Sequence, residues 1–149
     1  MTAKPADDEV SPGQRALWTF LLITLVAPFL AAVVIFLGSV IAGAIGRGPA
    51  SLLALDRAGQ LAWAGEKAVG AYVWSAIPAG IGGAIVAGLV FVRGSTHWLA
   101  GATVGALTAT MLSVSAGGMI AQHIAPIAFI AAFIGAVMCA GLKAGGIIK

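Results

Sequence analysis

Four stretches of this sequence contain no Asp, Glu, Lys or Arg over lengths that suit a membrane-crossing helix. They cover residues 16–45, 71–92, 98–120 and 127–142. Because an α-helix rises about 1.5 Å per residue, roughly 20 apolar residues cross the hydrocarbon core of a bilayer. The last stretch is the shortest, but it contains no residue that would stop a helix. We therefore predict an all-α, polytopic integral membrane protein with four transmembrane helices.

The composition agrees with lipid as the main solvent of this chain. Hydrophobic residues make up 60% of the 149 residues and charged residues 9%, whereas about a quarter of the residues in a typical soluble protein are charged. Residues 1–15 hold two prolines and an acidic triplet with no apolar period, which predicts a flexible tail. We expect residues 16–149 to form a single four-helix membrane domain.

The connections between the stretches predict how the helices are paired. Residues 93–97 are too short for anything but a tight turn, so we expect the second and third spans to be antiparallel neighbours, and residues 121–125 form the next turn. We expect the four spans to pack as two antiparallel hairpins. The connection between the first two spans is longer and carries five charged residues. On a helical wheel, Leu52 and Leu55 share one side of this connection and Asp56 lies on another, which predicts an interfacial helix over about residues 50–66. Such a helix serves either as a linker that shields apolar residues or as a partner-docking element.

Prolines and glycines interrupt the first two spans. Pro28 removes a backbone donor, and we expect the hydroxyl of Thr24 to help satisfy the backbone there. In the second span, Pro78 and the pair Gly82-Gly83 predict an irregular first half.

Small residues recur at every fourth position in three of the four spans. Helices inside a bilayer gain little from hydrophobic burial, so close approach at small residues is a main source of their cohesion. Since small residues fill about half of the third span, the pattern does not identify the neighbour of any one helix. The predicted helix-packing residues are Gly101, Gly105, Ala109, Ser113 and Gly117 in the third span and Gly80, Ala84 and Gly88 in the second, and a similar ladder in the fourth span is Ala128, Ala132, Ala136 and Ala140.

No catalytic, metal-binding or nucleotide-binding pattern is present in the sequence. An ionisable side chain inside a membrane would mark a functional site, and none of the four spans contains Asp, Glu, Lys or Arg. His97 and His123 bracket the third span and would lie roughly 39 Å apart along a continuous helix, too far to share one metal ion. Either histidine could still ligate a cofactor supplied by a partner chain. We predict a protein that is not an enzyme and that has no metal or cofactor of its own.

Abundant small-residue packing surface without buried charge favours an accessory or assembly subunit. The partners that we expect are the lipid bilayer and either further copies of this chain or other membrane subunits. Nucleic acid is not expected, because the basic residues are scattered. The alternative is a homo-oligomeric pore or carrier for a neutral small solute, in which serines and threonines of the third span line a polar path. Those residues are Thr103, Thr108, Thr110, Ser113 and Ser115.

Charge predicts the orientation in the membrane, because cytoplasmic loops retain Lys and Arg. The high Gly and Ala content and the small size suggest a bacterial cytoplasmic membrane. With four spans, both termini and the connection at residues 93–97 lie on the same side of the membrane. We expect this side to be cytoplasmic, because it carries five basic residues whereas the other side carries three. The five are Lys4, Arg15, Arg93, Lys143 and Lys149, and the three are Arg47, Arg57 and Lys67.

Overall fold

The computed structural model of this protein describes residues 11–115 and 124–148. All of the regular secondary structure in these two ranges is helical. The elements are α1 (Pro12–Ala44), α2 (Ala50–Leu53), α3 (Arg57–Arg93), α4 (Trp98–Ser115) and α5 (Ile124–Ala144). Helices α1, α3, α4 and α5 are each long and apolar enough to cross a membrane, and the short α2 lies between the first two of them. The predicted fold class is therefore confirmed.

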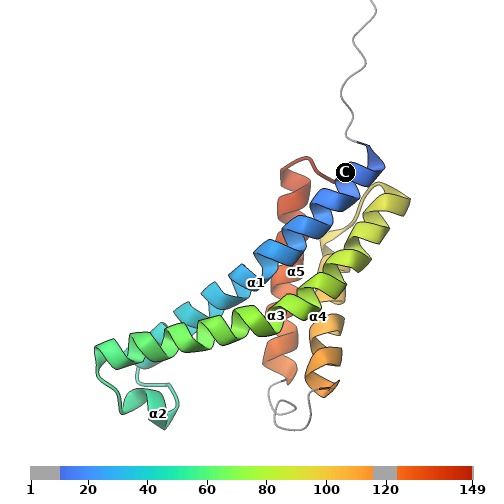
Figure 1. Ribbon diagram of the computed structural model, residues 1–149. Coiled ribbons are helices and arrows are strands. Elements are labelled where there is room, and N and C mark those ends of the chain that lie inside the picture. Colours follow the sequence, from blue (N-terminus) through green and yellow to red (C-terminus); the bar gives the residue numbers. More distant parts are fainter. Residues whose placement is uncertain (1–10, 116–123, 149) are drawn as a thin grey trace, which may run out of the picture.

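The four long helices form two antiparallel hairpins that cross each other. Helix α1 packs along α3, and α4 packs along α5 (Figure 1). The first hairpin runs obliquely across the second, so that the ends of α1 and α3 nearest α2 extend away from α4 and α5 (Figure 1). Contacts of α3 with α4 and of α1 with α5 join the two hairpins.

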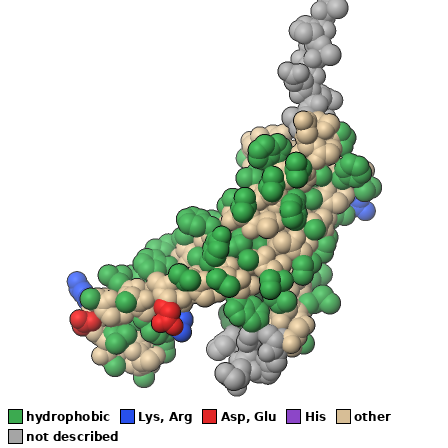
Figure 2. Space-filling model, in the orientation of Figure 1, with side chains coloured by type: hydrophobic (Ala, Val, Ile, Leu, Met, Phe, Trp, Pro, Cys, Tyr) green, Lys and Arg blue, Asp and Glu red, His purple; other side chains and the backbone are tan. Residues whose placement is uncertain are grey.

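Helix length explains this oblique course. The 33 residues of α1 and the 37 residues of α3 correspond to about 50 and 55 Å, well above the roughly 30 Å of a hydrocarbon core. With 18 and 21 residues, α4 and α5 are about 27 and 32 Å long and match that thickness. Tilting α1 and α3 in the membrane accommodates part of their extra length. Figure 2 shows charged side chains gathered at the α2 end, as expected for a part of the protein that lies at the membrane surface.

Helix α1 begins earlier than the predicted first span. The backbone N–H of Gln14 donates to Ser11 Oγ at 3.2 Å, and the backbone N–H of Ser11 donates to Gln14 Oε1 at 3.1 Å. This reciprocal capping box, with Pro12 at the first helical position, starts the helix. Residues 12–15, which the sequence places in a tail, are therefore helical.

The connection between α1 and α3 is shorter than predicted. An interfacial helix is present, but it covers only Ala50–Leu53, and residues 57–66 form the start of α3. Asp56 caps that start, because its side chain accepts a hydrogen bond from the N–H of Gly59 at 2.8 Å. The early part of α3 then packs on α1, where the side chain of Gln60 lies against Gly43.

Two expectations about the interrupted spans are wrong. Helix α3 is continuous through Pro78 and the glycine pair. Gly82 lies against Val104 and Thr108 of α4, and Gly83 lies against α1, so the glycines allow close packing on two neighbours. Among the described residues, the hydroxyl of Thr24 has no hydrogen-bond partner, and it faces Gly83 instead of satisfying the backbone near Pro28.

Candidate functional site

Helix α4 packs closely on α5 at its glycines. A β-carbon added at Gly105 would lie 2.5 Å from the carbonyl oxygen of Ala131, and one at Gly101 would lie 2.5 Å from that of Gly135. Cys139, which is 1% exposed, contacts Gly101 one turn further along α5. The first part of the small-residue ladder in α4 therefore faces α5 within the same chain.

The rest of that ladder faces the interior. Ala109 and Ser113 are both buried, and the Ser113 hydroxyl donates to the carbonyl oxygen of Ala109 at 2.8 Å. Gly117 lies outside the described residues.

The ladder of α3 faces outward instead. Ala84 and Gly88 are exposed, and no atom of residues 11–115 or 124–148 lies within 4 Å of a β-carbon added at Gly80 or Gly88. Two isoleucines beside this stripe, Ile81 and Ile85, are also half exposed. The side of α3 that combines small residues with an isoleucine ridge is thus not used by packing among the described residues.

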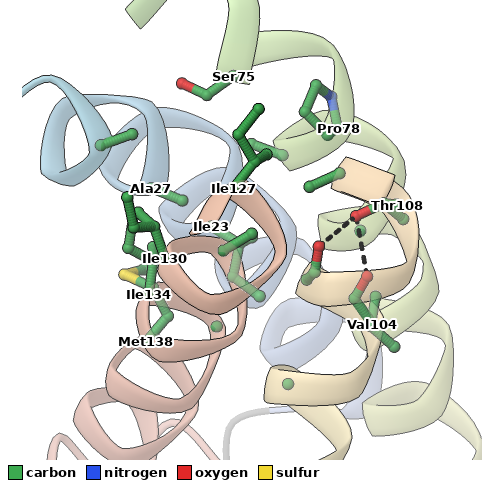
Figure 3. Close-up of a pocket in the computed structure, with 18 of the residues that line it drawn as sticks. Ile23, Ala27, Ser75, Pro78, Val104, Thr108, Ile127, Ile130, Ile134 and Met138 are labelled. Carbon is green, nitrogen blue, oxygen red and sulfur yellow. Dashed lines mark hydrogen bonds between the residues drawn. The ribbon is translucent and has the colours of Figure 1, made fainter. Parts of the chain in front are cut away.

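A cavity of about 350 Å³ lies where the two hairpins meet. All four long helices contribute to its wall, which is almost entirely apolar (Figure 3). Along α5 the wall extends from Ile127 to Cys139, a length of about 18 Å. Cys139 and Val86 are nearly fully buried, whereas the Trp74 side of the wall is exposed. The cavity is therefore long and apolar. Representative wall residues are Ile23 and Ala27 of α1, Pro78 of α3, Val104 of α4, and Ile130 and Met138 of α5.

The hydroxyl groups in the cavity wall are already engaged. Thr108 Oγ1 lies 2.8 Å from the carbonyl oxygen of Val104 and 3.2 Å from that of Gly105 (Figure 3). Ser113 bonds its own helix as described above, and Ser75 Oγ donates to the carbonyl oxygen of Tyr72 at 3.2 Å. Because each hydroxyl proton is committed to a backbone carbonyl, the wall favours an apolar occupant.

A second hollow, of about 310 Å³, follows α1 from the cavity toward α2. Ile35 of α1 and Ile130 of α5 line both hollows. We call this second hollow the α2 groove. At its α2 end it is bordered by Arg47, Leu52 and Trp63. The two hollows thus share part of their lining, and a basic residue borders the α2 groove at its α2 end.

The end of α1 fixes the position of Arg47. Gly46 adopts a left-handed conformation with φ of 66°, and the N–H groups of Gly46 and Arg47 donate to the carbonyl oxygens of Gly43 and Ala42 at 3.2 and 2.9 Å. This Schellman motif folds Arg47 back beside the last turn of α1. Its side chain is exposed.

The histidines and carboxylates are not gathered into a site within the described residues. His97 is exposed and caps α4, because its Nδ1 accepts a hydrogen bond from the N–H of Leu99 at 3.3 Å. His123 lies outside the described residues. Within residues 11–115 and 124–148, no group of three or more His, Cys, Asp or Glu side chains is placed to hold a metal ion.

Sequence reasoning missed two parts of this arrangement. The face of α5 that packs on α4 is Ala131, Gly135 and Cys139, one position before the alanine ladder that was expected there. A spacing of four residues centred on Gly135 is the sequence signal that could have identified this contact face. The sequence indicates Arg47 only as a topology signal, because it does not show that a groove ends beside this residue.

Comparison of the chain with protein-family profiles, curated proteins and solved structures gives no match.

Proposed function

We propose that this protein is a non-enzymatic subunit that assembles inside the membrane, with itself or with a larger complex, through the outward face of α3. The observation that carries this proposal is the small-residue stripe of Gly80, Ala84 and Gly88, in which Ala84 and Gly88 are exposed and Gly80 is half-buried. A second helix approaching such a stripe meets no side-chain obstruction, and backbone contact at small residues is the main attraction between helices in lipid.

The isoleucine ridge beside the stripe supports the same proposal. Ile77, Ile81 and Ile85 are 60%, 50% and 46% exposed and follow the same spacing of four as the small residues. A ridge next to a groove allows two helices to interlock. Lipid chains can cover isoleucines equally well, so the glycines make this face specific for a protein partner.

The test compares the wild-type chain with the variant Gly80→Leu/Gly88→Leu, extracted in a mild detergent. We expect the wild type to elute as an oligomer or hetero-complex, with its composition determined by mass spectrometry, and the double variant to elute as a monomer. Gly141→Leu is the matched control, because Gly141 also has open space around its α-carbon but lies on α5. A monodisperse wild-type monomer would refute the proposal.

The second candidate function is transport of a neutral small solute, which the cavity between the hairpins favours. Its wall includes the hydroxyls of Ser75, Thr108 and Ser113, although each donates to its own helix. Solute flux into liposomes that contain only this protein distinguishes transport from assembly. Flux that is lost in a Thr108→Leu variant, whose larger side chain narrows the cavity, would support transport over a purely structural role.

The proposed orientation places both termini and the turn at Arg93 in the cytoplasm of a bacterial cell. Arg15, Arg93 and Lys143 lie at that end of the helices, and Arg47, Arg57 and Lys67 lie toward the other. The five-to-three excess of basic residues over the whole sequence supports this assignment.

A further inference from the structure

We propose that the cavity between the two hairpins binds one acyl chain of a lipid of the surrounding bilayer. The chain lies along α5 and belongs to a lipid of the leaflet in which α5 begins. This binding does not depend on the assembly proposed above, because the cavity lies between the hairpins and the assembly face lies on the outer side of α3.

The cavity lies at the depth of the hydrocarbon core. Helix α5 begins at Ile124, and its part of the cavity wall runs from Ile127 to Cys139. Because the length of α5 matches the thickness of the core, the cavity begins about 5 Å and ends about 23 Å below the membrane surface at which α5 begins. Lipid chains are the medium at this depth, so they are the molecules that meet the cavity at the highest concentration.

The chemistry and the size of the cavity favour a slender apolar molecule. Apolar cavities stay dry unless polar groups bind the water, and the hydroxyls of Ser75, Thr108 and Ser113 donate to carbonyl oxygens of their own helices. The volume of about 350 Å³ is within the range of small-molecule pockets, about 300–1,000 Å³. A helix about 10–12 Å wide and about 18 Å long occupies roughly 1,400 Å³ or more, so a helix of a partner protein is too large.

The length of the cavity suits one extended acyl chain. Three helices each line it over about 18 Å, through residues 23–35 of α1, 101–113 of α4 and 127–139 of α5. An extended chain of single bonds advances about 1.2 Å per bond, as the polypeptide backbone does. An acyl chain of about 15 bonds that starts at the membrane surface therefore ends about 18 Å deep, just past the level of Ile134.

Burial along the cavity indicates the leaflet from which the chain comes. Toward the surface at which α5 ends, the interior is filled by Val90, Leu142 and Ile148, which are at most 3% exposed and belong to one apolar core with the last turn of the wall. A chain from that leaflet would have to displace these side chains. At the other end of the cavity, Ser75 and Ile127 are only half-buried, so the chain comes from the leaflet in which α5 begins.

Photo-crosslinking of the wild-type chain in liposomes tests the position of the acyl chain. Phosphatidylcholines that carry a photoreactive group at successive positions of one chain are incorporated, and the labelled residues are identified by mass spectrometry. One turn of α5 rises about 5.4 Å, so moving the group about four or five bonds toward the methyl end should move the label by about one turn. The expected order is Ile127, Ile130 and then Ile134, which line the cavity.

Two phenylalanines of the same helix provide the internal comparison. Phe129 and Phe133 are 74% and 58% exposed, so they report the ordinary lipid around the protein. Labelling confined to these two residues, with no label on the three isoleucines, would overturn the proposal.

A variant that fills the cavity tests the same site from the side of the protein. Ala27 of α1 lines the cavity (Figure 3), and Ala27→Leu should abolish the labelling of Ile134 while Phe133 is labelled as before. The control Ala140→Leu adds the same bulk at an exposed position of α5 and should retain both labels. Both variants are compared at an elution volume equal to that of the wild type. Labelling of Ile134 at the wild-type level in Ala27→Leu would show that the chain does not lie in the cavity.

Discussion

Two threonines in this protein have similar surroundings but opposite hydrogen-bond status. Thr24 Oγ1 is buried and has no hydrogen-bond partner in the part of the chain that the structure describes, whereas Thr108 Oγ1 donates to the carbonyl oxygen of Val104 at 2.8 Å. A buried hydroxyl without a partner costs free energy, because it has given up its hydration without compensation. The effect of removing each hydroxyl should therefore differ in sign.

The matched substitutions Thr24→Val and Thr108→Val test this difference. Valine has nearly the shape of threonine, so each change mainly removes the hydroxyl. We expect Thr24→Val to raise the free energy of unfolding by about 1–3 kcal/mol, the cost of an unsatisfied buried group. Thr108→Val should lower it by about 0.6 kcal/mol, the average value of a side-chain hydrogen bond inside a membrane. Reversible unfolding in mixed micelles, followed by circular dichroism, measures both, and a loss of stability in Thr24→Val would contradict the assignment.

At the scale of helices, the contact of α4 with α5 depends on glycine. The backbone of α5 cannot retreat easily from Gly105, since the neighbouring atom is the carbonyl oxygen of Ala131 and not a flexible side chain. Gly105→Ala should therefore lower the free energy of unfolding by about 1–3 kcal/mol through overpacking.

Gly141→Ala is the control for this prediction. Gly141 is exposed on α5, and no described residue lies within 4 Å of an added β-carbon. Alanine should therefore leave the stability unchanged or raise it by up to about 1 kcal/mol through its higher helix propensity. Equal thermal midpoints for Gly105→Ala and Gly141→Ala would mean that α4 and α5 are not in close contact.

Hydrophobicity was sufficient to predict the four spanning helices. The main neighbour of α3 was not predicted, because the short turn at residues 93–97 indicates the third span, whereas α3 packs mainly along α1. Their bounds depended on local hydrogen bonds that hydrophobicity does not report. The capping box of Ser11 and Gln14 extends α1, and the Asp56 cap starts α3 at Arg57. Both caps are visible in the sequence as a Ser or Asp before a helical run, but each lies in a polar stretch that was assigned to a tail or a surface segment.

Which small-residue ladder is buried could not be predicted, because that depends on how the hairpins cross. Gly101 and Gly80 belong to ladders with the same spacing and similar composition. One packs against α5 and the other faces outward. The cavity and the α2 groove arise from the same crossing, since they are bounded by residues of helices distant in sequence, such as Ile35 and Ile130.

At the scale of the whole molecule, the described charges leave a long uncharged stretch in the middle of the four long helices, with Glu66 and Lys67 in the first half of α3. Arg47, Asp56 and Arg57 lie at the α2 end, and Arg93 and Lys143 lie at the opposite end of α3 and α5. Between Lys67 and Arg93 no charged residue interrupts α3, a distance of about 39 Å. A slab of hydrocarbon about 30 Å thick fits between these two levels with α3 inclined.

The most direct test of this account is the side of the membrane from which each end of α3 can be reached. Single cysteines are introduced by Ala54→Cys, after α2, and by Ser95→Cys, between α3 and α4; both positions are exposed. Cys139 is 1% exposed and should not react. In sealed vesicles, a membrane-impermeant maleimide should label one introduced cysteine from outside and the other only after the vesicles are opened. Labelling of both cysteines from the same side would show that α3 does not cross the membrane, and the four-helix account would be wrong.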